Sequence, residues 1–298
     1  MATNNKVVIE GAERNKTPTR VIVGDVMLHL GVLIALVWAI FPLMFVLSAA
    51  LDPAGGLSSN ILPTKFSTVN FKFLFTEPNW PFATWFKNSL IVCTINAFVG
   101  TFIGATSAYA FSRLRFTGRR AGLMGLLMIQ MFPATLAFVA LYITFDKIGN
   151  VVPALGLNSI WGLMLAYAGG AMGANVWLLK GYFDTVPKEL DEAARMDGAS
   201  HARVFFTIVL PLVMPILVTV FMLSFIGTFG EFLLAGIFLQ DTDQWTLAVG
   251  LKALLEADKS KYFGPFAAGA LMVSVPIMVL YLAFQKQLTG GQTSGAVK

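Results

Sequence analysis

The chain has 298 residues, of which 56% are hydrophobic and only 12% are charged, and its mean hydropathy is +0.73. Soluble proteins carry about 25% charged residues, so this composition excludes a soluble enzyme, a disordered regulator and a nucleic-acid binder built on basic stripes. The single cysteine, Cys93, lies in an apolar run and allows no disulfide framework. With only two histidines, His29 and His201, we expect no metal site. The composition predicts a protein that crosses a membrane several times.

Six runs contain no Asp, Glu, Lys or Arg, and each reaches the roughly 20 residues that cross a bilayer core about 30 Å thick. These runs are 26–50, 89–111, 121–145, 160–179, 204–230 and 262–285. About twenty polar residues precede the first run, which is longer than the apolar core of a cleaved signal peptide. We therefore expect a retained membrane anchor, with an uncleaved targeting signal as the alternative.

The runs divide the chain into five parts. We expect an N-terminal tail (1–20), a first transmembrane helix (21–51), an external loop (52–87), a membrane core of five helices (88–287) and a C-terminal tail (288–298). A second external loop is expected at 240–261, between the last two spans.

The basic residues orient the chain. Six spans place both termini on one side, and fourteen of the 21 Lys and Arg residues fall on that side. Since loops rich in Lys and Arg stay in the cytoplasm, both termini are expected to be cytoplasmic. The net charge of +5 is then a topological signal and not a nucleic-acid footprint.

One cytoplasmic segment, 180–203, is polar but has helical patterning. Pro187 can begin a helix because its missing N–H costs nothing in the first turn. Acidic residues follow early, where the helix dipole favours them, and Gly198 can end the helix in a left-handed conformation. Ser200 can then cap a second helix that continues into the fifth run. The segment predicts a short surface helix, a glycine turn and a second helix that enters the membrane.

The short helix has the features of a docking element. Its i, i+3, i+4 spacing places Leu190, Ala193, Ala194 and Asp197 on one side. Small alanines allow a close approach by another surface, while Glu192 and Arg195 remain available for charged contacts. An amphipathic helix lying on the bilayer is the alternative, but such helices bury large apolar side chains.

This segment resembles the "EAA" signature of ABC importer permeases: Glu-Ala-Ala, three residues, Gly, nine residues, Ile, one residue, Leu-Pro. The matching residues are Glu192, Ala193, Ala194, Gly198, Ile208, Leu210 and Pro211. Other stretches resemble the smaller permease subunit of maltose/maltodextrin-type importers. They are 108–116, 130–142, 145–149, 179–187, 245–251 and the glycine-rich end 288–298.

The resemblance implies an all-α membrane protein with six transmembrane helices, the type I ABC importer permease fold and a cytoplasmic coupling helix. It also implies a bacterial inner-membrane location, a second permease subunit, two ATPase subunits, an extracytoplasmic sugar-binding protein and contact with membrane lipid. By resemblance, the tail 288–298 reaches between the ATPase subunits and the loop 240–261 contacts the binding protein. The residues assigned to ATPase coupling are Glu189, Glu192, Ala193, Ala194, Asp197, Gly198, Leu210 and Pro211.

Four polar residues inside or beside the runs are candidates for the transport pathway: Asn96, Gln130, Asn175 and Glu231. The three amides can bind sugar hydroxyls, although hydrogen bonds between helices are the commoner use. Glu231 is either a membrane-embedded functional carboxylate or a structural group at the external interface.

The chain lacks the G-x-x-x-x-G-K-[ST] phosphate loop, so ATP would be bound by partner subunits and the chain itself has no cofactor. The favoured function is the permease subunit of an ATP-driven, binding-protein-dependent importer for maltose, maltodextrin or a related oligosaccharide. The alternative is an ion-coupled secondary sugar transporter or a channel, which would need ionisable residues near the membrane midplane.

Overall fold

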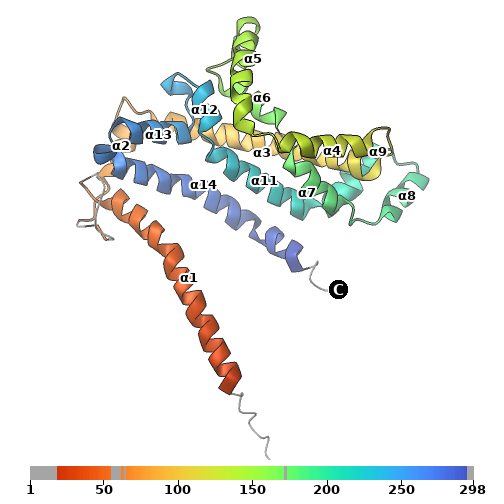
Figure 1. The fold of residues 1–298 in the computed structure, drawn as a ribbon, viewed down its shortest axis with the longest axis horizontal. Coiled ribbons are helices and arrows are strands. Elements are labelled where there is room, and N and C mark those ends of the chain that lie inside the picture. The colour runs from red at the N-terminus through yellow and green to blue at the C-terminus, as the bar shows by residue number, and fades with distance from the viewer. Residues whose placement is uncertain (1–18, 55–61, 64, 171–172, 294–298) are drawn as a thin grey trace, which may run out of the picture.

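A computed structural model describes residues 19–54, 62–63, 65–170 and 173–293 (Figure 1). Every regular element in these ranges is a helix, so the all-α prediction is confirmed for the described residues. The predicted N-terminal tail, except for its last two residues, and the end of the C-terminal tail lie outside them.

The first helix, α1 (Thr19–Leu51), covers the range predicted for the first transmembrane helix and points away from the other helices (Figure 1). None of the side chains in its most apolar window is buried. Only its last residues are packed: Ala49 and Ala50 are fully buried, and the Asn70 amide donates to the Ala50 carbonyl at 3.0 Å. The rest of α1 presents an apolar surface, which suits lipid or another membrane protein.

The central helix is α3 (Phe82–Arg113), which contacts α11 (Met214–Phe229) and α7 (Ala174–Phe183) along its length. The long last helix, α14 (Lys259–Thr293), packs on α11 and extends beyond the predicted end of the sixth run. Small residues allow this packing, because a Cβ at Gly104 of α3 would already lie 3.1 Å from the Leu179 side chain. The resulting bundle forms the body of the molecule.

The third and fourth runs do not form continuous helices. The third divides into α4 (Arg119–Gln130) and α5 (Phe138–Val151), joined by a 3₁₀ turn after Pro133, because proline removes a backbone donor and its ring obstructs the preceding turn. The fourth divides into α6 (Ile160–Gly169) and α7 at a glycine-rich break. The predicted spans 121–145 and 160–179 therefore each contain a break.

Four described helices are long and apolar enough to cross a membrane, and a bent pair provides a fifth. They are Gly24–Leu51, Phe82–Arg113, Ala134–Val151 and Lys259–Gln287, with His201–Leu212 and Met214–Phe229 as the bent pair. Among the residues that the structure describes, the length and apolarity of the helices therefore do not establish six membrane spans.

The predicted external loops contain helices. The first includes α2 (Val69–Thr76), and the second, 240–261, includes α13 (Leu247–Ala257), with α12 (Leu233–Phe238) just before it. Helix α13 places apolar residues at helical spacing and buries Leu247, Leu251 and Leu254, so this connecting segment is packed on the bundle.

These helices cover one end of the bundle, opposite α8 (Lys188–Met196) and α9 (His201–Val204) (Figure 1). Trp85 joins them to α3, since its indole Nε1 donates to the Thr242 carbonyl at 2.8 Å. Gly250 lies so close to the Trp85 ring that an added Cβ would be 2.1 Å from it.

Candidate functional site

The predicted short helix is present as α8, and its ends are set by the expected residues. Pro187 is the N-cap, Glu189 and Asp191 lie in the first turn, and Arg195 lies in the last. Gly198 follows with a φ of +84°, a left-handed conformation that L side chains disfavour. The amide of Ala199 donates to the Ala194 carbonyl at 2.9 Å, which closes the end of the helix.

The second predicted helix is also present. The Ser200 hydroxyl accepts from the Arg203 amide at 3.3 Å and caps α9. A π-helical turn (Phe205–Val209) and α10 (Leu210–Leu212) follow, and the chain then bends by 80° into α11. Pro211 lies beside this bend, where π turns and missing proline donors are known causes of kinks.

A buried ion pair holds α8 against α3, and the sequence reasoning missed it. Arg113 Nε lies 3.0 Å from Asp191 Oδ2, and the two side chains are 4% and 13% exposed. Arg113 Nη2 also donates to the Val186 carbonyl at 2.6 Å. Asp191 and Ala194 are three residues apart and both face the bundle, so the i, i+3 spacing was a usable signal.

The opposite face of α8 is exposed. Its residues are Glu189, Leu190, Glu192, Ala193, Met196 and Asp197. The predicted grouping of Ala194 with Leu190, Ala193 and Asp197 is wrong in one member, because Ala194 packs against the bundle. Met196, at 89% exposed, was not singled out from the sequence. We call these six exposed residues the α8 outer face.

Leu210 and Pro211 are not part of the α8 outer face. They lie in α10, beyond the π-helical turn, where Leu210 packs against a buried cluster that includes Val204 and Leu217. Their position fits a role in directing the chain into α11 and not a role in surface contact.

The chain that leads into α8 is fixed to the end of α3 by a second polar contact. The Ser112 hydroxyl donates to Asp184 Oδ1 at 2.5 Å, and Lys180 Nζ lies 2.5 Å from Asp184 Oδ2. Burial disfavours ionisation of this carboxyl, but the hydrogen bonds from Lys180 and Ser112 outweigh it and lower the pKa of Asp184 below its ordinary value.

The candidate pathway residues do not converge on one site. The Asn96 amide donates to Thr228 Oγ1 at 2.6 Å and joins α3 to α11, which is the interhelical use. The Gln130 amide donates to the Leu126 carbonyl of its own helix and is exposed. Asn175, in α7, is half-buried beside Gly104 of α3.

Glu231 acts as a structural acceptor. Its Oε1 accepts from the Leu234 amide at 2.7 Å and its Oε2 from the Ala235 amide at 3.0 Å, so the carboxylate caps α12. The Tyr167 hydroxyl of α6 donates to the same carboxylate. Glu231 therefore joins α12 to α6, and of the two readings the structural one fits these contacts.

Residues 100–288 match the family described as the inner membrane component of binding-protein-dependent transport systems. The match covers more than half of the chain, and the chain therefore belongs to this family. It is a multi-pass membrane permease subunit of a binding-protein-dependent ABC importer.

The chain is similar to the maltose/maltodextrin transport system permease protein MalG. It is 40% identical to MalG of Vibrio vulnificus (strain YJ016) over 281 residues, which cover 91% of this chain and 94% of that protein. It is 38% identical to MalG of Escherichia coli (strain K12) over the same shares of both chains.

A crystal structure of a bacterial ABC transporter involved in the import of the acidic polysaccharide alginate has a chain with the same fold. The TM-score is 0.73 at 21% identity, and the match covers 92% of this chain and 99% of that one. The fold is thus that of a type I ABC importer permease, as the sequence predicted.

Proposed function

We propose that the chain is one of two permease subunits of an ATP-driven importer for maltose, maltodextrin or a related oligosaccharide. The substrate class is supported by 38–40% identity to maltose permeases over 91% of the chain. As a permease, the chain performs no chemistry of its own, and partner subunits bind and hydrolyse ATP.

We further propose that α8 is the docking element for a cytoplasmic ATPase subunit. The observation that carries this proposal is the combination of an exposed outer face with a buried attachment. Glu189, Glu192 and Asp197 offer carboxylates, Ala193 allows close approach, and Met196 provides an adaptable apolar side chain.

Motion of α8 would reach the membrane helices through two routes. The ion pair between Arg113 and Asp191 connects α8 to α3, and the chain through α9 and α10 connects it to α11. Both α3 and α11 belong to the central bundle. A pull on α8 would therefore be transmitted as movement of these two helices.

The remaining partners follow from the same arrangement. The long exposed surface of α1 suits the second permease subunit and lipid, and the end formed by α2, α12 and α13 suits the sugar-binding protein. The distribution of Lys and Arg supports a location of both termini in the cytoplasm of a bacterial cell. Coupling to an ion gradient is disfavoured, since the Glu231 carboxylate is occupied by Tyr167 and the α12 backbone.

Reconstitution of the complete transporter tests the docking proposal. With the ATPase subunits, the second permease and the binding protein present, Glu192→Lys together with Gly198→Pro should lower maltose uptake and ATPase co-purification at least tenfold. Glu256→Lys, at an exposed side chain of α13 at the other end, is the matched charge reversal and should leave ATPase co-purification unchanged. Normal co-purification and uptake by the double variant, with its thermal midpoint preserved, would contradict the proposal.

A separate panel tests the substrate. Uptake of labelled maltose should be inhibited by unlabelled maltose and maltotriose and not by alginate oligosaccharides. Inhibition by alginate oligosaccharides alone would reject the maltose assignment and leave the docking proposal intact.

A further inference from the structure

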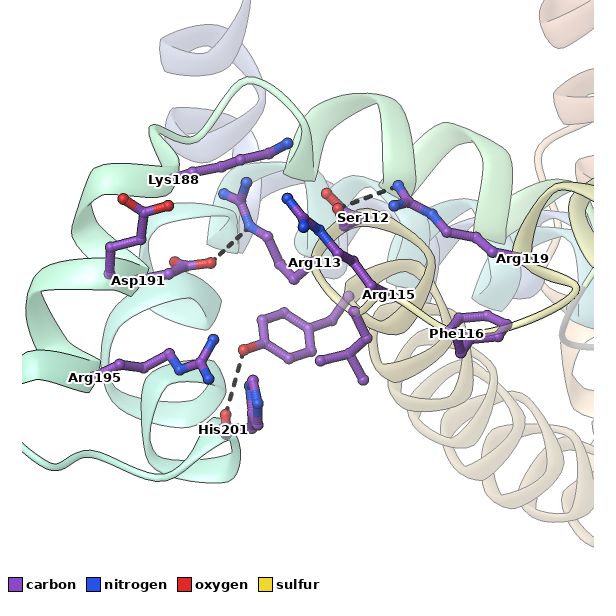
Figure 2. A pocket seen from close by; sticks show the side chains of 12 residues that line it. Ser112, Arg113, Arg115, Phe116, Arg119, Lys188, Asp191, Arg195 and His201 are labelled. Carbon is purple, nitrogen blue, oxygen red and sulfur yellow. Dashed lines mark hydrogen bonds and ion pairs between the residues drawn. The ribbon is translucent and has the colours of Figure 1, made fainter.

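A cationic cavity of about 630 Å³ lies between the end of α3 and the inner side of α8 (Figure 2). The segment 114–116, the first residue of α4 and His201 of α9 complete its wall. The volume falls in the range of small-molecule sites, about 300–1,000 Å³. The cavity is therefore large enough for a ligand group.

Five permanently charged cations line the cavity, against two carboxylates. The cations are Arg113, Arg115, Arg119, Lys188 and Arg195, and the carboxylates are Asp191 and Glu192, of which Glu192 lies at the edge that the cavity shares with the α8 outer face. Asp191 is already paired with Arg113. Arg115, Lys188 and Arg195 are exposed, and no described carboxylate forms an ion pair with them. The lining thus has an excess of positive charge that suits an anion.

The innermost cation has an unused donor. The Arg113 side chain is 4% exposed, yet its Nη1 has no hydrogen-bond partner among the described residues. Buried polar atoms in folded proteins are nearly always hydrogen-bonded. An oxyanion in the cavity would supply the acceptor that Arg113 Nη1 lacks, and guanidinium groups are well suited to phosphate oxygens.

The position of the cavity indicates which anion. The apolar span of α3 ends at Arg113, so the cavity lies where a membrane helix leaves the apolar layer. At the same edge, α4 begins beside the end of α3, since a Cβ at Gly122 would lie 3.4 Å from the Phe111 ring. Helix α4 carries exposed apolar side chains, among them Met124 and Met128, at 56% and 71% exposed. A cationic cavity continuous with an exposed apolar helix matches an anionic headgroup with its acyl chains.

We propose that this cavity binds the phosphate headgroup of an anionic phospholipid, with the acyl chains lying along α4. Arg115, Lys188 and Arg195 contact the phosphate at the mouth, and Arg113 lies behind it. Because Arg113 and Lys188 belong to α3 and α8, the lipid bridges the junction that carries motion from the docking helix to the membrane. The site requires neither a sugar nor ATP.

Native mass spectrometry of the complete transporter in detergent tests the site. The complex is titrated with phosphatidylglycerol or, separately, with phosphatidylcholine. The double variant Arg115→Gln/Lys188→Gln should lower retention of phosphatidylglycerol about tenfold or more, since each basic residue near an anionic lipid surface contributes about a factor of five. Arg120→Gln/Arg203→Gln removes the same charge from residues outside the cavity lining and should change retention less than twofold.

The source of the phosphate is distinguished by competition. Inorganic phosphate and glycerol 3-phosphate at millimolar concentration should not displace the lipid, and displacement by either would reassign the cavity to a soluble phosphate. Equal retention of phosphatidylcholine and phosphatidylglycerol would overturn the proposal. The variant Arg115→Gln/Lys188→Gln could instead lose the ATPase subunit while its lipid retention stays unchanged. This result would also overturn the proposal, because it would show that the cavity receives an acidic side chain of the partner. Each variant must have a thermal midpoint within 2 °C of wild type. Arg195→Gln replaces any variant that does not meet this requirement.

Discussion

Arg113 Nε and Asp191 Oδ2 lie 3.0 Å apart and join the last residue of the central helix α3 to the first turn of α8. Both side chains are almost completely removed from solvent. This contact turns a short helix on a loop into a part of the bundle. It lets the outer face of α8 remain exposed without making the helix mobile.

Removing one partner of this ion pair should strongly destabilise the protein. Asp191→Ala leaves the Arg113 guanidinium buried and unpaired, which costs about 3–5 kcal/mol. The thermal midpoint of the purified protein should fall clearly. Glu189→Ala, two residues before Asp191 and on the exposed side, should change the free energy of unfolding by less than about 0.5 kcal/mol.

The double variant Arg113→Met/Asp191→Leu separates charge burial from packing. Because it leaves no unpaired charge, it should be more stable than either single variant. Additive losses in the double variant would show that the two residues do not act as a pair.

Substitutions at Gly198 test the backbone conformation of the turn that ends α8. At a φ of +84°, a Cβ would meet nothing within 4 Å, so the effect of a substitution is conformational and not steric crowding. Gly198→Ala should cost about 1–2 kcal/mol, and Gly198→Asn should cost less, because Asn tolerates this conformation better. The measurement is the free energy of unfolding by urea or heat.

Gly181 provides the matched control for that turn. It lies in helix α7, and a Cβ there also meets nothing within 4 Å. Gly181→Ala should be neutral or stabilising by up to about 1 kcal/mol. Equal destabilisation by Gly181→Ala and Gly198→Ala would contradict the conformational account.

Glu231 should behave as a structural residue. Glu231→Ala removes the cap of α12 and the acceptor of the Tyr167 hydroxyl, and the loss of such a cap costs about 0.5–2 kcal/mol. Glu231→Gln keeps an acceptor oxygen and should retain most of the stability and the uptake rate. A correctly folded Glu231→Gln protein with no uptake would instead support an ion-coupling role.

The carboxyl of Asp184 should make the stability of the folded protein depend on pH in the acid range. Its pKa is lower in the folded protein than its ordinary value of about 3.9. At a pH above that ordinary value, the ionised carboxyl therefore stabilises the folded protein. This contribution is lost as the pH falls through the lower pKa of the folded protein. Wild type should be more stable than Asp184→Asn by a constant margin between pH 6 and 8. The margin should shrink below about pH 4, and a margin that grows on acidification would refute the assignment.

Local rules predicted α8 and its surroundings well. Pro187, Gly198 and Ser200 act through their own backbone conformation or a hydrogen bond to a near neighbour in sequence, so their roles are visible in the chain itself. The helical range of α1 was also predicted closely, because its apolar run is long and uninterrupted.

The sequence was less informative where contacts between residues far apart in the chain determine the structure. Asp191 is one of the early acidic residues of α8, and nothing in its neighbourhood in the sequence indicates Arg113, which is 78 positions away, as its partner. Likewise, the close packing of Gly250 in α13 against the Trp85 ring of α3 joins residues far apart in the sequence. Apolar length alone also does not show the break in the third run, since Pro133 interrupts it without adding charge.

The most direct test of the docking role is chemical protection of the α8 outer face. The only native cysteine, Cys93, is buried at 1% exposure, so an engineered cysteine can be labelled selectively. Met196→Cys replaces a residue of this face that is 89% exposed, and Phe66→Cys, at a side chain 79% exposed in wild type, serves as the control at the other end of the bundle. Maleimide labelling is followed with and without the ATPase subunits. The proposed function predicts that the ATPase subunits slow labelling of Met196→Cys at least tenfold and leave Phe66→Cys unchanged. Equal labelling of Met196→Cys in both states would contradict it.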